Sequence, residues 1–299
     1  MRLASLDPDG PVAAEIAELW WILLALGGAV FVLFLILLVR GLVKKSDTSQ
    51  ETANRLVLGG GVVLPLVGVT LVFALTLIAM RALPVAGDSD RLTVEITGYQ
   101  WWWDVVYPEL GLRSANEIYV PVGTEFELRL LAADVVHSFW VPALAGKMDL
   151  LPDKTTSMVI EAAEAGTYRG VCAEFCGLQH AKMAFRVVAV SEANFAAWIE
   201  SQGRIPADAV DEPGRQVFLD AGCGSCHTID GTSDGETGPD LTHLASRLTL
   251  AAGTFPNTPD HLRSWVKRPQ ELKEGVAMQN IDLPEESLDA LLRYLESLE

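Results

Sequence analysis

The stretch CAEFCGLQHAKM, residues 172–183, places two cysteines, a histidine and a methionine close together. Thiolate, imidazole and thioether groups are soft to borderline ligands that suit copper. We expect this stretch to be a loop between two strands, because a sheet fixes the positions of ligands that a loop carries. Three interpretations compete: a disulfide loop, a structural zinc site, and a copper site that carries electrons.

The sequence around this loop predicts an all-β sandwich or barrel over residues 84–195. Apolar and polar residues alternate in several stretches separated by proline and glycine, which is typical of short strands. These stretches are RLTVEITGYQWWWDVVYP (91–108), EIYVPVGTEFELRLLAAD (117–134), TSMVIEAAEAGTYRGV (156–171) and MAFRVVAVS (183–191). DVVHSFWVP (134–142) adds His137 at the end of a strand as a further candidate ligand.

The ligand inventory favours copper over the two other interpretations. A Cys172–Cys176 disulfide leaves His137, His180 and Met183 without a role. A structural zinc ion has no use for a methionine. A single copper ion needs only one cysteine, so the second thiolate is accounted for if both bridge two copper ions. The backbone carbonyl of Glu174, between the cysteines, could complete the site.

A second prosthetic-group motif lies in GRQVFLDAGCGSCHTIDG, residues 214–231. C-x-x-C-H attaches haem covalently through Cys223 and Cys226 and binds iron through His227. Leucines at helical spacing follow in PEESLDALLRYLESLE, residues 284–299. Helix, haem loop and terminal helix resemble a small class I cytochrome c, and the linker 196–211 precedes this domain, 212–299.

The second axial ligand of the haem iron is a methionine or a histidine in proteins of this chemistry. Met278, in KEGVAMQN shortly before the last helix, occupies the place of the axial methionine in that family. The proline that usually follows it is Gln279 here. His243 and His261 are the alternatives.

Two uncharged runs near the N-terminus predict a transmembrane hairpin. The first spans about 19–40 and the second about 56–80, and each is long enough to cross a bilayer as a helix. Acidic residues rather than basic ones precede the first run, which argues against a signal peptide, although a leader removed upstream of Met1 stays open. Arg40, Lys44, Lys45 and Arg55 place the short loop in the cytoplasm and both termini outside.

The charge of the chain excludes one class of partner. The formal net charge of the 299 residues is -17, and phosphate binding needs a basic face, so we expect no nucleic-acid role. An acidic surface suits a basic protein partner. The four cysteines form two close pairs, each followed by a histidine, which fits prosthetic-group sites better than a disulfide framework.

C-x-E-x-C-x3-H-x2-M, preceded by DVVHSFWVPALAGKMDLLP, resembles the dinuclear copper (CuA) domain of cytochrome c oxidase subunit II. The resemblance implies a cupredoxin fold, with a copper pair bound by His137, Cys172, the Glu174 carbonyl, Cys176, His180 and Met183. It also implies a magnesium ion at the Glu174 side chain, where the catalytic subunit docks. Electrons enter that family through the first tryptophan of Q-W-x-W, here Trp101, although a packing or interfacial role for Trp101, Trp102 and Trp103 is the alternative.

One departure from that family concerns proton delivery. Relatives often carry a glutamate near the start of the second span, whereas NRLVLGGGVVLP (54–65) contains no acidic residue. Glu51 is the nearest candidate.

Together these features predict a membrane-anchored multidomain chain: residues 1–83 with the two-helix hairpin, the cupredoxin domain, the linker and an all-α cytochrome c domain. We interpret it as subunit II of a caa3-type haem-copper oxidase in the bacterial inner membrane, with both soluble domains on the periplasmic side. Cytochrome c or a quinol–cytochrome c reductase would donate electrons, and subunit I, with further oxidase subunits, would reduce oxygen. The alternatives are a subunit of a nitric oxide or nitrous oxide reductase and a membrane-anchored electron carrier acting alone.

Overall fold

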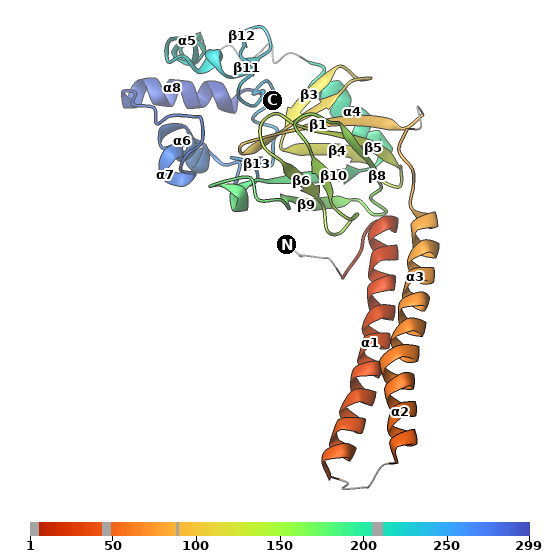
Figure 1. Ribbon diagram of the computed structural model, residues 1–299. Coiled ribbons are helices and arrows are strands. Elements are labelled where there is room, and N and C mark those ends of the chain that lie inside the picture. The colour runs from red at the N-terminus through yellow and green to blue at the C-terminus, as the bar shows by residue number, and fades with distance from the viewer. Residues whose placement is uncertain (1–5, 44–48, 88–89, 205–211) are drawn as a thin grey trace.

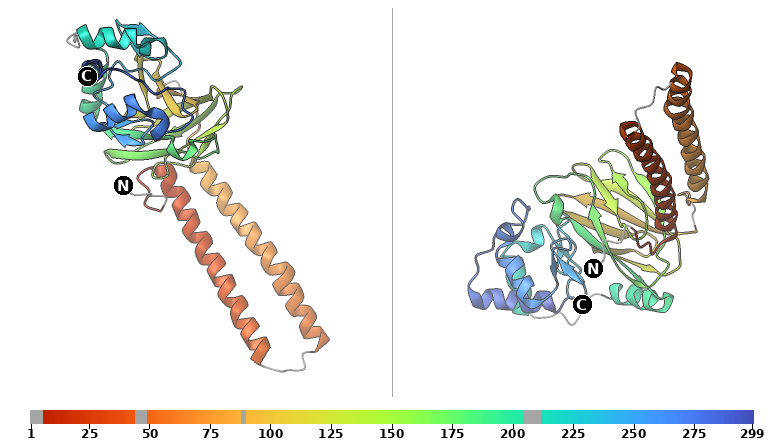
Figure 2. Two further views of the ribbon diagram at one scale, coloured as in Figure 1. Left: turned by 90° about the vertical axis from the view of Figure 1, so that its left-hand side faces the viewer. Right: turned by 90° about the horizontal axis from the view of Figure 1, so that it is seen from below.

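The computed structural model describes residues 6–43, 49–87, 90–204 and 212–299. In chain order these residues form a helical hairpin, a β-sandwich and a smaller, mainly helical domain (Figure 1). The hairpin projects from one end of the sandwich, and the C-terminal domain packs beside the sandwich, away from the hairpin (Figure 2). The hairpin and the C-terminal domain therefore contact different sides of the sandwich.

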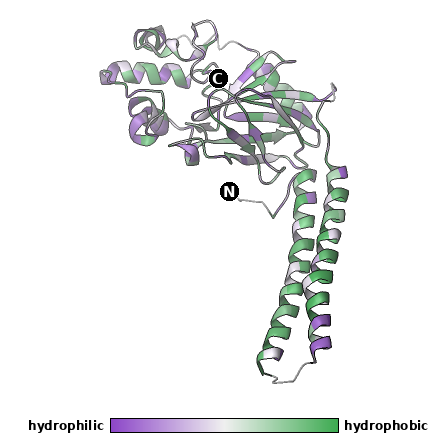
Figure 3. Cartoon of the chain, in the orientation of Figure 1, coloured by the Kyte–Doolittle hydropathy of each residue, from purple (hydrophilic) through white to green (hydrophobic). Residues whose placement is uncertain are grey.

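The hairpin is longer than the two apolar runs that predict it. Helix α1 covers Pro11–Val43, and the second arm is a continuous helix of α2 (Gln50–Leu58), a π-helical turn η1 (Gly59–Val63) and α3 (Leu64–Ala82). Both arms are long and apolar enough to cross a membrane, and Figure 3 shows them hydrophobic along most of their length. The π-helical turn coincides with three consecutive glycines. Lys44 and Lys45 of the predicted cytoplasmic loop lie outside the described residues.

The start of α1 is fixed to the sandwich by backbone hydrogen bonds. The amides of Asp9 and Gly10 both donate to the carbonyl of Ala143, at 2.8 and 3.1 Å. The amide of Ala163 donates in return to the carbonyl of Asp9 at 2.8 Å. A Cβ at Gly10 would lie 2.6 Å from the carbonyl oxygens of Glu161 and Leu144, so only glycine fits this junction.

The sandwich consists of two five-stranded sheets that pack around one hydrophobic core. The first sheet has the order β3-β2-β1-β5-β8 and the second β4-β10-β9-β6-β7. The pairs β1–β5 and β4–β10 are parallel and the other pairs are antiparallel. The strands are β1 (Leu92–Tyr99), β2 (Trp102–Tyr107), β3 (Leu112–Ala115), β4 (Glu117–Pro121), β5 (Phe126–Ala132), β6 (His137–Trp140), β7 (Met148–Leu150), β8 (Thr156–Ile160), β9 (Gly166–Cys172) and β10 (Ala184–Val190).

An aromatic cluster fills the core near the end of β6. Trp103, Phe139 and Phe185 are almost completely buried, and the Phe139 and Phe185 rings stack with centroids 4.4 Å apart. The Trp103 ring lies 5.1 Å from that of Phe185 and 6.0 Å from that of His137. Because close-packed cores resist displacement, this cluster gives His137 a rigid support.

Helix α4 (Glu192–Gln202) extends the sandwich domain beyond the boundary that the sequence suggests. Trp198 stacks on Tyr119 with centroids 4.8 Å apart and contacts the Tyr107 ring edge-on. Residues 196–202, assigned to the linker from sequence, are therefore packed helix, because the sequence pattern did not reveal these aromatic partners. Residues 205–211 of the linker lie outside the described part of the chain.

The C-terminal domain places four helices around a small core that includes Phe218, Leu291 and Tyr294. Helices α5 and α8 pack together, and the Phe218 and Tyr294 rings meet edge-on at 6.0 Å. Two short two-stranded sheets complete it. Its elements are α5 (Glu212–Asp220), η3 (Cys223–Ser225), β11 (Thr228–Ile229), β12 (Ser233–Asp234), β13 (Thr249–Leu250), β14 (Phe255–Pro256), α6 (Pro259–Lys267), α7 (Pro269–Leu272) and α8 (Glu285–Glu296).

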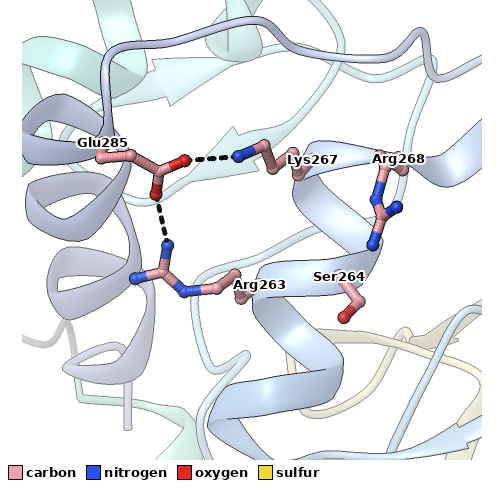
Figure 4. Close-up of a pocket in the computed structure, with 5 residues that line it drawn as sticks. All are labelled: Arg263, Ser264, Lys267, Arg268 and Glu285. Atoms are coloured by element: carbon pink, nitrogen blue, oxygen red, sulfur yellow. Dashed lines mark hydrogen bonds and ion pairs between the residues drawn. The ribbon is translucent and has the colours of Figure 1, made fainter.

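Ion pairs on the surface join α6 to α8. Glu285 of α8 accepts from Arg263, at 3.0 Å, and from Lys267, and the three side chains border an open cavity of about 380 Å³ (Figure 4). Arg263 also pairs with Asp289, and Arg268 with Glu271. Carboxylates thus neutralise this basic group, and such exposed pairs stabilise a fold only slightly.

Candidate metal and haem sites

The residues that the sequence proposes as metal ligands converge at one end of the second sheet. His137 is the first residue of β6 and Cys172 the last of β9, so the pairing of these strands brings them together. The loop after β9 returns through the 3-10 turn η2 (His180–Lys182) to Met183. Both cysteines and Met183 are buried, and His137 is 0% exposed.

Each cysteine sulfur lies near two other atoms that could bind a metal ion, and the two sets differ. Cys172 Sγ lies 3.2 Å from the Glu174 carbonyl oxygen and 3.8 Å from His137 Nδ1. Cys176 Sγ lies 3.6 Å from His180 Nδ1 and 3.8 Å from Met183 Sδ.

The two sulfur atoms are 3.7 Å apart and both thiols are free, whereas a disulfide bond is about 2.05 Å long. Two thiolates between two imidazoles, with one weaker donor on each side, match the ligand needs of a pair of soft ions.

The two thiols share their protons unequally. Contact with Cys176 lowers the pKa of Cys172 to about 3, and the same contact, together with burial, raises the pKa of Cys176. Cys172 therefore ionises more readily than Cys176. Metal ligands must be deprotonated, so loading this site is expected to release protons.

Asp134 orients His137 from the side opposite the cysteines. His137 Nε2 and Asp134 Oδ1 are 2.8 Å apart, and the ring nitrogen there donates because a carboxylate can only accept. Burial lowers the pKa of His137, but Cys172 and Asp134 raise it by more. Nδ1 is left facing Cys172, which is the arrangement that a carboxylate imposes on metal-binding histidines.

Gly98 in β1 leaves the space that the His137 ring occupies. A Cβ at this position would lie 2.9 Å from His137 Cδ2 and 3.1 Å from Cγ. The ring is fully buried and cannot yield without moving Nδ1 away from Cys172.

We expect Gly98→Ala to weaken metal binding by about 10- to 100-fold, the loss typical when the support of a metal ligand is disturbed. Metal affinity measured by competition with a chelator checks this. Gly166→Ala is the matched control, because its Cβ would meet only the Tyr168 ring at ordinary contact distances of 3.6–3.8 Å. Equal affinities in both variants would show that the space at Gly98 does not hold His137 in place.

Two side chains of the segment before β2 bind the backbone of the loop between Cys172 and Met183, the metal loop. Gln100 Nε2 and Trp101 Nε1 both donate to the carbonyl oxygen of Cys176, at 2.7 and 3.0 Å. Trp101 and Trp103 are buried, whereas Trp102 is half-buried and stacks on Tyr99 with centroids 4.6 Å apart. Trp102 is thus more exposed than Trp101 and Trp103, but Trp101 lies in the turn before β2, so strand alternation relates only Trp102 and Trp103.

A second candidate site is a cavity of about 450 Å³ in the C-terminal domain. Cys223, Cys226, His227 and Met278 all line it, together with apolar side chains such as those of Leu244 and Leu295. The sandwich residues Tyr99, Gln100, Trp101 and Trp102 form part of the same wall, so the cavity lies where the two domains meet. An apolar cavity that brings the C-x-x-C-H motif and a methionine together fits a covalently attached haem.

His227 is held in the state that an iron ligand requires. Its Nδ1 lies 2.8 Å from the carbonyl oxygen of Pro239, so Nδ1 carries the proton and donates. Burial lowers the pKa of His227 and keeps the ring neutral, which leaves the lone pair of Nε2 free. A Cβ on Gly238 would lie 2.7 Å from His227 Cε1, so the loop packs directly on this ring.

Neither alternative histidine lines the cavity. The ring nitrogens of His243 lie 2.9 Å from the carbonyl oxygens of Gln202 and Glu299. His261 contacts the Thr258 hydroxyl at 2.8 Å and stacks on Phe255. Met278 remains as the candidate second axial ligand.

Sequence reasoning missed Asp134, Gly98, Gln100 and Lys273. Asp134 lies only three residues before His137, and this spacing is the one local signal that could have identified a supporting residue. Lys273 donates across the domain interface to the Trp101 carbonyl. No local pattern indicates that a lysine or a glycine contacts a segment far away in the chain.

Comparisons with known proteins match both soluble domains. The family description "Cytochrome C oxidase subunit II, periplasmic domain" matches residues 109–190, and "Cytochrome c" matches residues 212–299. Cytochrome c oxidase subunit 2 of Alkalihalophilus pseudofirmus is 35% identical over an alignment covering 99% of this chain and 91% of the relative. The same-named protein of Bacillus subtilis is 30% identical, with 70% of this chain and 63% of the relative covered.

Quinol oxidase subunit 2 of Bacillus subtilis is 32% identical, and the alignment covers 65% of each chain. Among solved structures, the periplasmic domain of subunit II of cytochrome oxidase of Bradyrhizobium japonicum is 30% identical. It has a TM-score of 0.38 and covers 40% of this chain and 96% of that chain. Because the Alkalihalophilus relative aligns with almost the whole chain and both domain families match, the chain belongs to the cytochrome c oxidase subunit 2 family.

Proposed function

We propose that this chain is the electron-transfer subunit of a caa3-type cytochrome c oxidase, and that it passes electrons from a haem c to a dinuclear copper centre. The position of Trp101 carries this proposal. Its side chain lines the cavity proposed for haem and donates a hydrogen bond to the backbone of Cys176. One aromatic residue thus contacts both sites.

In this proposal the copper pair is held by His137, Cys172, the Glu174 carbonyl, Cys176, His180 and Met183. The haem is attached at Cys223 and Cys226, with His227 and Met278 as axial ligands. When bound, the two groups supply reversible one-electron chemistry. The chain buries His137 and both cysteines of the metal site, orients His137 and His227 through Asp134 and Pro239, and lines the haem cavity mainly with apolar side chains.

The tethered haem, rather than Trp101, is the point at which an external donor delivers electrons. Trp101 is only 9% exposed, and its carbonyl accepts from Lys273 of the C-terminal domain at 2.8 Å. An external protein therefore has little access to Trp101 while the domains are in contact. The donor is expected to be a basic cytochrome c or a quinol–cytochrome c reductase, because the chain is acidic.

The hairpin anchors the chain in the bacterial inner membrane beside subunit I, which reduces oxygen. We propose that both arms cross the bilayer, with the two soluble domains on the periplasmic side. The Glu174 side chain is exposed next to the metal loop, where it could contact magnesium and subunit I.

The test is the metal content of the full chain purified in mild detergent. We expect two copper ions and one covalent haem per chain, together with co-purification of a subunit that contains haem a. One zinc ion without copper would overturn the copper assignment. A loaded chain that purifies without any oxidase subunit would favour a separate electron carrier.

A further inference from the structure

Lys273 is a buried lysine whose amino group joins the two soluble domains. It follows α7, is 2% exposed, and its Nζ donates to the carbonyl oxygens of Trp101 at 2.8 Å and Ala251 at 3.1 Å. Trp101 belongs to the sandwich domain and Ala251 to the turn between β13 and β14. A single amino group therefore fixes three segments that are distant in sequence.

Burying the Lys273 amino group costs free energy unless its hydrogen bonds to the Trp101 and Ala251 carbonyls are formed. Among the described residues no carboxylate lies within ion-pair distance of its amino group, and burial followed by the nearby charge of Lys182 lowers its pKa to about 7. A buried ammonium group must be hydrogen-bonded to be tolerated, and an apolar side chain of the same size would fill the space at lower cost. Specific contact with two carbonyl groups is therefore the role that explains a lysine here.

A buried glutamate of the sandwich binds the C-terminal domain, in the opposite direction to Lys273. Glu117 of β4 is 1% exposed and accepts hydrogen bonds from the amides of Leu248 and Thr249, at 3.1 and 2.8 Å. The amide of Ala184 adds a backbone bond to the carbonyl of Ala252 at 3.0 Å. These contacts hold the β13–β14 turn, to which Lys273 also binds, against the sandwich.

We propose that Lys273 is a positioning residue that holds the C-terminal domain in the orientation in which Trp101 borders the haem cavity. The role of this orientation in electron transfer rests on the proposed function, whereas the contact between the domains does not. Lys273 acts through the backbone of Trp101, to whose carbonyl it donates, and its side chain also borders the cavity proposed for haem. Loss of the contact is expected to loosen the interface, which the Glu117 and Ala184 bonds still hold, without unfolding either domain.

The test compares Lys273→Met with Lys267→Met in the full chain in detergent. Both changes replace an ammonium group by an apolar side chain of similar length in the same domain. Lys267, however, is half-buried, and within the described part of the chain its ion pair is with Glu285 across the surface of α6 and α8 (Figure 4). The first readout is hydrogen exchange at the amides of Ala184, Leu248 and Thr249, which donate across the interface. The second is the rate of electron exchange between haem and copper after rapid photoreduction.

We expect exchange at these three amides to accelerate about tenfold or more in Lys273→Met, the effect of losing a hydrogen bond to a charged group. The haem and copper spectra should stay unchanged, electron exchange between the centres should slow, and Lys267→Met should match the parent chain. Glu117→Gln should give the same pattern, because it weakens the reciprocal contact. Unchanged amide exchange in Lys273→Met, or equal acceleration in Lys267→Met, would overturn the proposal. Missing copper or haem in the parent chain would instead count against the proposed function, since the amide readout requires neither.

Discussion

Replacing Cys176 with serine is expected to remove the copper pair completely while leaving the covalent haem in place. Cys176 Sγ is the atom around which Cys172, His180 and Met183 gather at 3.6–3.8 Å. A serine hydroxyl is a harder ligand that does not bridge copper ions as a thiolate does. Copper per chain, measured by elemental analysis, and the absorbance of the thiolate–copper bonds check this result.

The reciprocal control is Cys226→Ser, which should diminish covalent haem attachment without loss of copper. Cys226 lines the cavity of the C-terminal domain and makes no contact with the copper ligands among the described hydrogen bonds. In each variant the site that is not altered therefore serves as an internal control for the site that is. If Cys176→Ser retained two copper ions, the assignment of the metal loop would be wrong.

The second large effect is expected from Trp101→Phe, which should slow electron exchange between haem and copper. Phenylalanine retains an aromatic ring but loses the Nε1–H that donates to the Cys176 carbonyl at 3.0 Å. One such hydrogen bond stabilises a contact by about 1 kcal/mol, so its loss raises the population of arrangements in which the ring has left the loop by about fivefold. The measurement is the rate at which copper absorbance follows photoreduction of the haem.

Trp102→Phe is the matched control for this experiment. Trp102 lines the same cavity and stacks on Tyr99, and the described hydrogen bonds give it no contact with the metal loop. Phenylalanine keeps an aromatic ring beside Tyr99, and the change removes no hydrogen bond to the metal loop, so the rate should stay within about twofold of the parent chain. Equal slowing in both variants would assign the effect to the wall of the haem cavity as a whole rather than to the Trp101 contact.

The proposed metal ligands could be selected from the sequence because most of them lie within one loop. Cys172 through Met183 depend on local spacing, and His137 was identified from its place at the end of a predicted strand. The haem motif was likewise local, and Met278 followed from its order along the chain. Short-range spacing was therefore enough to propose both sites, and the structure brings the proposed residues together at each of them.

The supports of those ligands could not be predicted in the same way. The need for glycine at position 98 arises only when β1 lies beside the His137 ring, and that distance depends on the packing of the two sheets. Lys273 occurs in the polar stretch ELKEG, where a lysine normally faces solvent. Its burial depends on the contact between two domains, which no periodicity encodes. The extension of α4 to Gln202 was missed for the same reason, since the stacking of Trp198 on Tyr119 is a long-range contact.

The backbone hydrogen bonds at the start of α1 fix the rotation of this helix about its own axis relative to the sandwich. Asp9 and Gly10 are bound to the Ala143 carbonyl immediately before the helix begins, so the helix cannot turn about its axis independently. An α-helix advances about 100° per residue. Inserting one residue early in α1 would therefore rotate the membrane-facing side of the whole arm by that angle. The face that the hairpin presents to a neighbouring subunit is thus set by the number of residues between Gly10 and the bilayer.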